Sequence, residues 1–126
     1  MRITRSFYNS KDRDWMSCPC CNSFKYDENF MRLVQELRDE MHTPFHLTKY
    51  GGGFFRCEKY QLENHPETPK SQHCKGKAMD VLTIGWDGQM RWRFLDLAMK
   101  KKFSIGIYRD FFHIDARDTV PVTWVG

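Results

Sequence analysis

Residues 71–84 read SQHCKGKAMDVLTI, and the second half of this stretch alternates with the period of two that is typical of a β-strand. The strand predicted at 78–84 is rich in β-branched side chains and carries one carboxylate, Asp80, on the same face as Ala78, Leu82 and Ile84. Gly76 precedes the strand and permits a sharp turn. Because His73 lies just before that turn, a loop histidine and a strand aspartate are expected to converge.

Two amphipathic helices are predicted on either side of this strand. Apolar residues recur three or four apart over 27–42, with Asp27 as the cap, and again from Asp87 or Gly88 to the lysines at 100–102. The other predicted segments are strands at 45–49, 104–108 and 111–116, a glycine turn at 51–53 and a polar loop at 58–70. Helices packed around a small antiparallel sheet define the α+β class.

Length and composition indicate a single globular domain, 1–126. The chain has 126 residues, of which 40% are hydrophobic and 15% aromatic, enough for one core. No apolar run approaches the roughly 18 residues of a membrane helix, so no membrane segment is expected. The basic N-terminus, 1–15, lacks the apolar region of a secretory signal. A net charge of +4 favours anionic partners without selecting among them.

Five cysteines in a chain without an export signal are expected to be reduced, and an odd number cannot pair completely. Their spacing is Cys-x-Cys-Cys at 18–21, followed by the single residues Cys57 and Cys74. The paired Cys-x-x-Cys units of common zinc sites are absent. A sulfur-rich zinc site is therefore the alternative interpretation, and Cys74 is not counted as a ligand because its neighbour His73 is expected to point inward.

A second histidine, His113, completes a hard-ligand set with His73 and Asp80. Two histidines and one aspartate leave a fourth position open, which is the arrangement of catalytic zinc. Asp110 stands three residues before His113 and can share the site only if it lies in the turn that leads into the strand. There it would act as general base and then general acid. The alternative for Asp110 is a surface turn or an ion pair with Arg109.

The motif S-x-H-x-x-G-x-A-x-D at 71–80, followed by D-x-x-H-x-D at 110–115, resembles the zinc D-Ala-D-Ala carboxypeptidase family. That family includes phage L-alanyl-D-glutamate endolysins and shares its fold with the Hedgehog signalling domain. The resemblance covers about 28–124. It implies a Hedgehog/DD-peptidase-like fold with Zn²⁺ as cofactor.

The resemblance also implies roles for individual residues. His73, Asp80 and His113 would be the zinc ligands and Asp110 the catalytic carboxylate. Arg56 would bind the scissile carbonyl oxygen as negative charge develops on it, because a guanidinium is always charged and offers several donors.

Two further residues are expected near the site. Ser71 would contact substrate or support a ligand, with capping of a turn as its alternative. Asp115 shares a strand face with His113 and could orient that ligand, or it could pair with Arg117. Trp124 is expected in the core or on the wall of a groove.

The implied function is a zinc metallopeptidase that hydrolyses a peptide bond in the stem peptides or cross-links of bacterial peptidoglycan. Small size and the lack of an export signal suit a monomeric phage endolysin, made in the host cytoplasm and acting in the periplasm or cell wall after release. Alternatives are a D-Ala-D-Ala carboxypeptidase that trims wall precursors and a non-catalytic domain that binds cell wall or nucleic acid. The leading interpretation expects no nucleic-acid partner.

Overall fold

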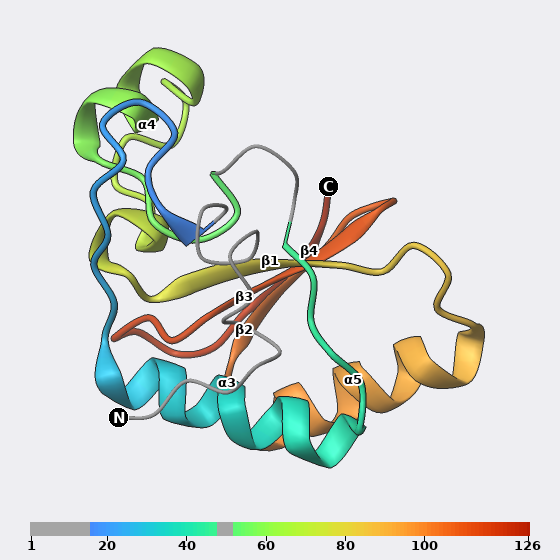
Figure 1. Ribbon diagram of the computed structural model, residues 1–126. Helices are drawn as coiled ribbons and strands as arrows, with labels where there is room; N and C mark the ends of the chain where they lie inside the picture. The colour runs from blue at the N-terminus through green and yellow to red at the C-terminus, as the bar shows by residue number, and fades with distance from the viewer. Residues whose placement is uncertain (1–15, 48–51) are drawn as a thin grey trace.

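The computed structural model describes residues 16–47 and 52–126 (Figure 1). Its helices and strands are α3 (Glu28–Met41), α4 (Glu58–Asn64), the 3₁₀ helix η1 (Gln72–Lys75), β1 (Ala78–Leu82), α5 (Gly88–Lys100), β2 (Ser104–Ile107), β3 (Phe111–Asp115) and β4 (Thr123–Val125). These four strands form one sheet in the order β1-β3-β2-β4. The predicted α+β class is confirmed.

The sheet is mixed, so the prediction of an antiparallel sheet is wrong for one strand. β3 pairs antiparallel with both β1 and β2, whereas β4 runs parallel to β2 at the edge. β4 was not predicted because it has only three residues and follows a proline, so it is too short to show the alternating pattern of a strand.

Helices α3 and α5 begin and end where the sequence indicates. The Asp27 carboxylate accepts a hydrogen bond from the Phe30 N–H at 2.8 Å, and the Asp87 carboxylate accepts one from the Met90 N–H at the same distance. α3 ends at His42, whose φ of +52° is left-handed. The helices predicted at 27–42 and from 87 or 88 onward are therefore confirmed.

The core lies between one face of the sheet and the α3 and α5 pair, which run together along that side of the molecule (Figure 1). Phe94 of α5 packs on Phe112 of β3 with ring centroids 5.5 Å apart. Because side chains alternate along a strand, burial of Phe112 and Ile114 on this face turns His113 to the opposite face. That opposite face carries the polar residues of the sheet.

Two other predicted segments differ from the structure. The polar loop at 58–70 is helical in its first half, where α4 buries the side chain of Gln61 and ends before Pro66. In the strand predicted at 45–49, Leu47 makes an isolated bridge to Val81, and 48–49 lie outside the described residues, as does the first glycine of the turn at 51–53.

Within 16–47 and 52–126, no helix has the length and apolar character needed to cross a bilayer.

Candidate metal centre

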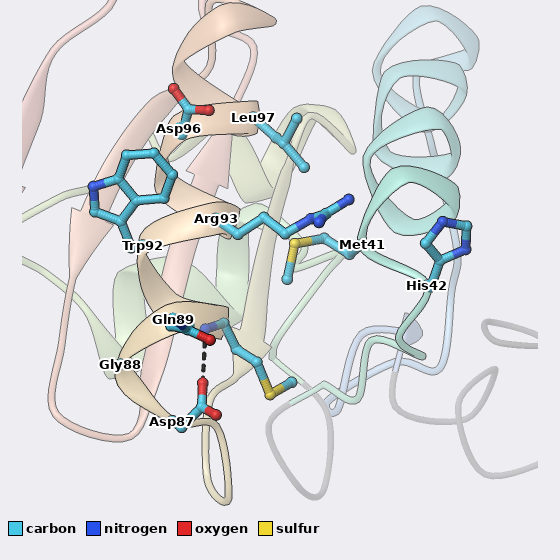
Figure 2. A pocket seen from close by; sticks show the side chains of 10 residues that line it. Met41, His42, Asp87, Gly88, Gln89, Trp92, Arg93, Asp96 and Leu97 are labelled. Atoms are coloured by element: carbon cyan, nitrogen blue, oxygen red, sulfur yellow. Dashed lines mark hydrogen bonds between the residues drawn. The ribbon is translucent and has the colours of Figure 1, made fainter.

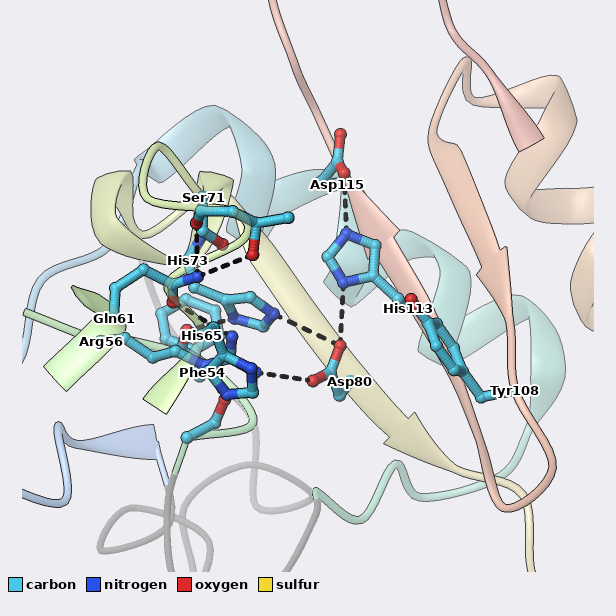
Figure 3. Close-up of polar contacts among 12 residues, drawn as sticks. Phe54, Arg56, Gln61, His65, Ser71, His73, Asp80, Tyr108, His113 and Asp115 are labelled. Atoms are coloured by element: carbon cyan, nitrogen blue, oxygen red, sulfur yellow. Dashed lines mark hydrogen bonds and ion pairs between the residues drawn. The ribbon is translucent and has the colours of Figure 1, made fainter. Parts of the chain in front are cut away.

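The structure brings His73, Asp80 and His113 together. Asp80 on β1 and His113 on β3 are direct cross-strand partners, and His73 lies on η1 immediately before β1. One Asp80 oxygen, Oδ1, lies 2.9 Å from His113 Nδ1 and 3.3 Å from His73 Nε2 (Figure 3). These three atoms lie within 4.8 Å of one another, which is the spacing of donors around a single metal ion.

Residues on either side of His73 fix the turn that carries it. Ser71 caps η1, because its Oγ accepts a hydrogen bond from the His73 N–H at 3.2 Å. Gly76 ends η1 with a φ of +67°, and a Cβ at this position would lie 2.5 Å from the Lys25 carbonyl oxygen. A side chain is excluded here by both conformation and space. The structure thus gives Ser71 the turn-capping role, on the wall of the same cavity as His73.

The hydrogen bond of the His73 ring sets its tautomer. Nδ1 lies 2.6 Å from the backbone carbonyl oxygen of Phe54, and a carbonyl only accepts, so Nδ1 carries the hydrogen. Nε2 is then a free lone pair directed toward Asp80. Burial lowers the pKa of His73, so the ring is neutral at pH 7. A neutral imidazole held by its other nitrogen is the form that binds a metal.

His113 lies between two carboxylates. Its Nε2 is 2.7 Å from Asp115 Oδ2, and its Nδ1 is the atom beside Asp80. Burial alone would lower the pKa of His113, but hydrogen bonds to Asp115 and then Asp80 raise it to about 9. When no metal is bound, the His113 ring is therefore an imidazolium, and its positive charge lies beside Asp80, where a metal cation would bind.

Asp115 is fully buried and hydrogen-bonds Nε2 of His113, the ring nitrogen that does not face Asp80. It also binds Arg117 through two hydrogen bonds, Nε to Oδ1 at 2.9 Å and Nη2 to Oδ2 at 2.7 Å. The two roles that the sequence left open for Asp115 are thus both present. If Nε2 keeps its hydrogen toward Asp115, Nδ1 is free to bind a metal beside Asp80.

The donor set fits zinc. It consists of two imidazole nitrogens and one carboxylate oxygen, and each histidine has a hydrogen-bond partner on its other nitrogen. Burial by itself would raise the pKa of Asp80, but the hydrogen bond and positive charge of His113 hold it well below its usual value, so a full negative charge is available. Three ligands leave one position open toward the cavity.

Arg56 lies beside the three candidate metal ligands. Its Nη2 is 3.3 Å from the second Asp80 oxygen, its Nε donates to the Gly52 carbonyl at 2.6 Å, and its Nη1 donates to Gln61 at 3.2 Å. Gln61 is in turn anchored by its Nε2, which donates to the Thr68 carbonyl at 2.7 Å. The guanidinium is therefore fixed in orientation, with three of its five N–H groups engaged.

The ligands form part of the wall of a cavity of about 480 Å³. The wall next to His113 is aromatic: the ring centroid of Trp124 on β4 lies 5.3 Å from that of His113, and the Trp124 Nε1–H donates to the Tyr108 hydroxyl at 2.9 Å. Gly106 of β2 is the cross-strand partner of both His113 and Trp124, and a Cβ on this residue would come within 2.6 Å of the Trp124 ring. Trp124 is thus a cavity residue, and the glycine inside a predicted strand was the signal that marks such a close approach.

Asp110 does not join this group in the structure. It lies in the turn between β2 and β3 with 62% of its side chain exposed, and its nearest charged partner is Arg109, at 4.0 Å. Its backbone carbonyl accepts a hydrogen bond from Thr83, beyond the end of β1. The sequence analysis did not single out three charged or titratable side chains that line the cavity, His65, Glu67 and Lys70.

A larger hollow of about 760 Å³ lies elsewhere, between the end of α3 and the start of α5 (Figure 2). Its polar groups serve the helices: Asp87 caps α5, and Arg93 donates to the Glu40 carbonyl at 2.7 Å. Among the residues that line it, no three side chains converge as metal ligands. The candidate metal ligands His73, Asp80 and His113 line the smaller cavity.

Comparisons of the chain with protein-family models, with curated proteins and with solved structures found no match.

Proposed function

We propose that this chain is a zinc-dependent hydrolase that cleaves a peptide bond in bacterial peptidoglycan. One observation carries the proposal: the donor atoms of His73, Asp80 and His113 converge on the wall of an open cavity, beside a fixed arginine. The motif resemblance supports the narrower choice of peptidoglycan as the substrate.

Bound at this set, a zinc ion supplies a Lewis acid that polarises a carbonyl group and makes water a nucleophile near neutral pH. The chain itself orients the ligands. The Phe54 carbonyl and Asp115 hold one nitrogen of each histidine, so that His73 Nε2 and His113 Nδ1 face Asp80. No ligand has to reorganise when the substrate arrives.

Arg56 is proposed to bind the carbonyl oxygen of the scissile bond. Its guanidinium lines the cavity and is anchored by the Gly52 carbonyl, Gln61 and Asp80, which leaves two of its five N–H groups for a substrate. Because this charge is fixed before the reaction, it favours the state in which the oxygen is most negative. Trp124 and Tyr108 form an apolar wall suited to the small side chains of a stem peptide.

The positive charge of Lys70, at the edge of the cavity, favours an acidic substrate. It is exposed and carries a positive charge beside the site, where it can attract the free carboxylates of D-glutamate or of a terminal residue in a stem peptide. A D-Ala-D-Ala carboxypeptidase would use the same charge for a terminal carboxylate. The two activities therefore differ in their products and not in their metal chemistry.

Proton transfer is assigned in the proposal to Asp110, as the resemblance implies. Since its side chain is exposed in the β2–β3 turn, this role requires the turn to swing toward the cavity when substrate binds. Glu67, which already lines the cavity, is the competing carboxylate. Asp110→Asn is expected to lower kcat by about 10²- to 10⁴-fold with zinc retained, and Glu67→Gln to leave kcat nearly unchanged.

The test is to incubate zinc-loaded protein with defined muropeptides and to read the fragment masses. Cleavage between L-alanine and D-glutamate, or within a cross-link, supports an endolysin; release of terminal D-alanine supports a carboxypeptidase. His73→Ala should abolish cleavage, and Asp118→Asn, which alters an exposed carboxylate away from the ligands, should not. Intact muropeptides after incubation with zinc-loaded wild-type protein would refute the proposal.

A further inference from the structure

Four of the five cysteines lie together, although 37 positions separate Cys20 from Cys57. The Cys20 sulfur is 3.2 Å from that of Cys57 and 3.9 Å from that of Cys18, and with Cys21 all four sulfur atoms lie within 4.8 Å of one another. Zinc–sulfur bonds of 2.3 Å in a tetrahedron place sulfur atoms about 3.8 Å apart. The cluster is therefore the size of a tetrahedral thiolate site.

A tight turn brings three of these cysteines to one place. The Cys18 N–H donates to the Ser23 carbonyl at 2.8 Å, and the Asn22 N–H donates to the Cys18 carbonyl at 2.8 Å. Asn22 has a φ of +58°, a left-handed conformation that asparagine tolerates better than most residues. The chain thus reverses within six residues and turns Cys20 and Cys21 back toward Cys57.

The fourth cysteine comes from the start of α4. The Cys57 N–H donates to the Cys18 sulfur at 3.3 Å, and the Phe55 N–H donates to the Met16 carbonyl at 3.1 Å. Figure 1 shows the first described segment, in blue, running beside α4. The Cys18 side chain is buried, and a backbone donor directed at its sulfur favours the thiolate form that binds metals.

We propose that these four cysteines form a second metal site, which binds one zinc ion as a closed tetrathiolate centre. Four soft ligands with no open position are typical of structural zinc. A disulfide joins only two sulfur atoms and leaves the convergence of the other two without a reason. The site is independent of the hydrolase proposal, because none of its ligands belongs to the His73 group.

The zinc ion has a structural consequence for the catalytic cavity. Cys57 is the immediate neighbour of Arg56, whose N–H donates to the His73 carbonyl at 3.4 Å. Tying Cys57 to the 18–21 turn therefore fixes the backbone that carries the arginine. The chain thus uses sulfur ligands to hold its scaffold and leaves nitrogen and oxygen ligands for the open site.

Metal analysis of reduced, full-length protein tests the proposal. Wild type and the matched control Cys74→Ser should each bind two equivalents of zinc, whereas Cys57→Ser and His73→Ala should each bind one. If the His73 group binds no zinc, wild type should bind one equivalent and Cys57→Ser none, so the two proposals fail separately. Equal zinc content in wild type and Cys57→Ser would overturn the tetrathiolate site.

Cobalt substitution gives a readout that needs no variant. Co²⁺ in wild-type protein should show thiolate-to-metal charge transfer in the near ultraviolet together with the strong visible bands of tetrahedral cobalt. A cobalt-loaded protein without these bands would overturn the proposal. So would an intact mass, measured on freshly purified protein, that shows a disulfide and no bound metal.

Discussion

Replacing Asp115 with asparagine should weaken zinc binding at the His73 group through the tautomer of His113. Asp115 Oδ1 accepts from both the backbone N–H and Nε of Arg117, so the amide oxygen of the new side chain should take the Oδ1 position, and the amide NH₂ then takes the Oδ2 position and faces His113 Nε2. Nε2 then has to accept, which moves the ring hydrogen to Nδ1. That hydrogen then occupies Nδ1, the atom beside Asp80 that would otherwise bind the metal.

The expected loss in zinc affinity is about 10- to 100-fold, the usual effect of removing a partner of a metal ligand, which corresponds to about 1.4–2.7 kcal/mol. Titration against a chromophoric chelator measures this affinity. The zinc equivalent to follow is the one that the His73→Ala variant lacks. Asp118→Asn is the matched control, because Asp118 pairs with Lys77 and is 79% exposed. Asp115→Asn with zinc affinity within twofold of wild type would refute the tautomer argument.

Three further perturbations follow from the same geometry. Gly106→Ala should displace the Trp124 ring and lower kcat/KM with zinc content unchanged, measured on muropeptides; loss of zinc instead would contradict the view that this residue shapes only the aromatic wall. Gly76→Ala should lower the unfolding free energy by at least about 1–2 kcal/mol in urea, because its φ of +67° is strained for alanine and its Cβ meets Lys25; Gly88→Ala, where a Cβ meets nothing, is the control. In chelator, the stabilising contribution of His113 should be fully present below pH 6.5 and be lost as pH rises to about 9, because the pKa of this ring is raised when the chain is folded; zinc affinity should rise over the same range as that proton is displaced, and unchanged stability between pH 6.5 and 9 would contradict this.

The fold was predictable where one physical signal dominates. Helices α3 and α5 carry both a periodic apolar face and an aspartate cap, and β1 is an almost fully apolar segment that follows a glycine turn. α4 was missed because its cap is Cys57, an unusual capping residue, and because prolines downstream indicate a loop. Its one buried side chain, Gln61, is polar, so no apolar stripe marks the helix.

The convergence of His73, Asp80 and His113 was predictable from the sequence, and the surroundings of these residues were less so. His73 and Asp80 are near in sequence, and the strand period places His113 on an available face. Long-range pairing decides the rest: Trp124 reaches the site only because β4 joins β2 in parallel. The sulfur cluster depends in the same way on Cys57 meeting the 18–21 turn, a contact that cysteine spacing does not encode.

The row Asp80, His113, Gly106 and Trp124 crosses all four strands at one level of the sheet. A slip of one residue between β1 and β3 would send Asp80 or His113 to the opposite face and separate the ligands. Tight zinc binding is thus possible only for chains whose strands have assembled in the native alignment. The ion would bind only after the strands have aligned, and the zinc held at the His73 group, which is the equivalent that His73→Ala lacks, would report the fraction of correctly aligned molecules.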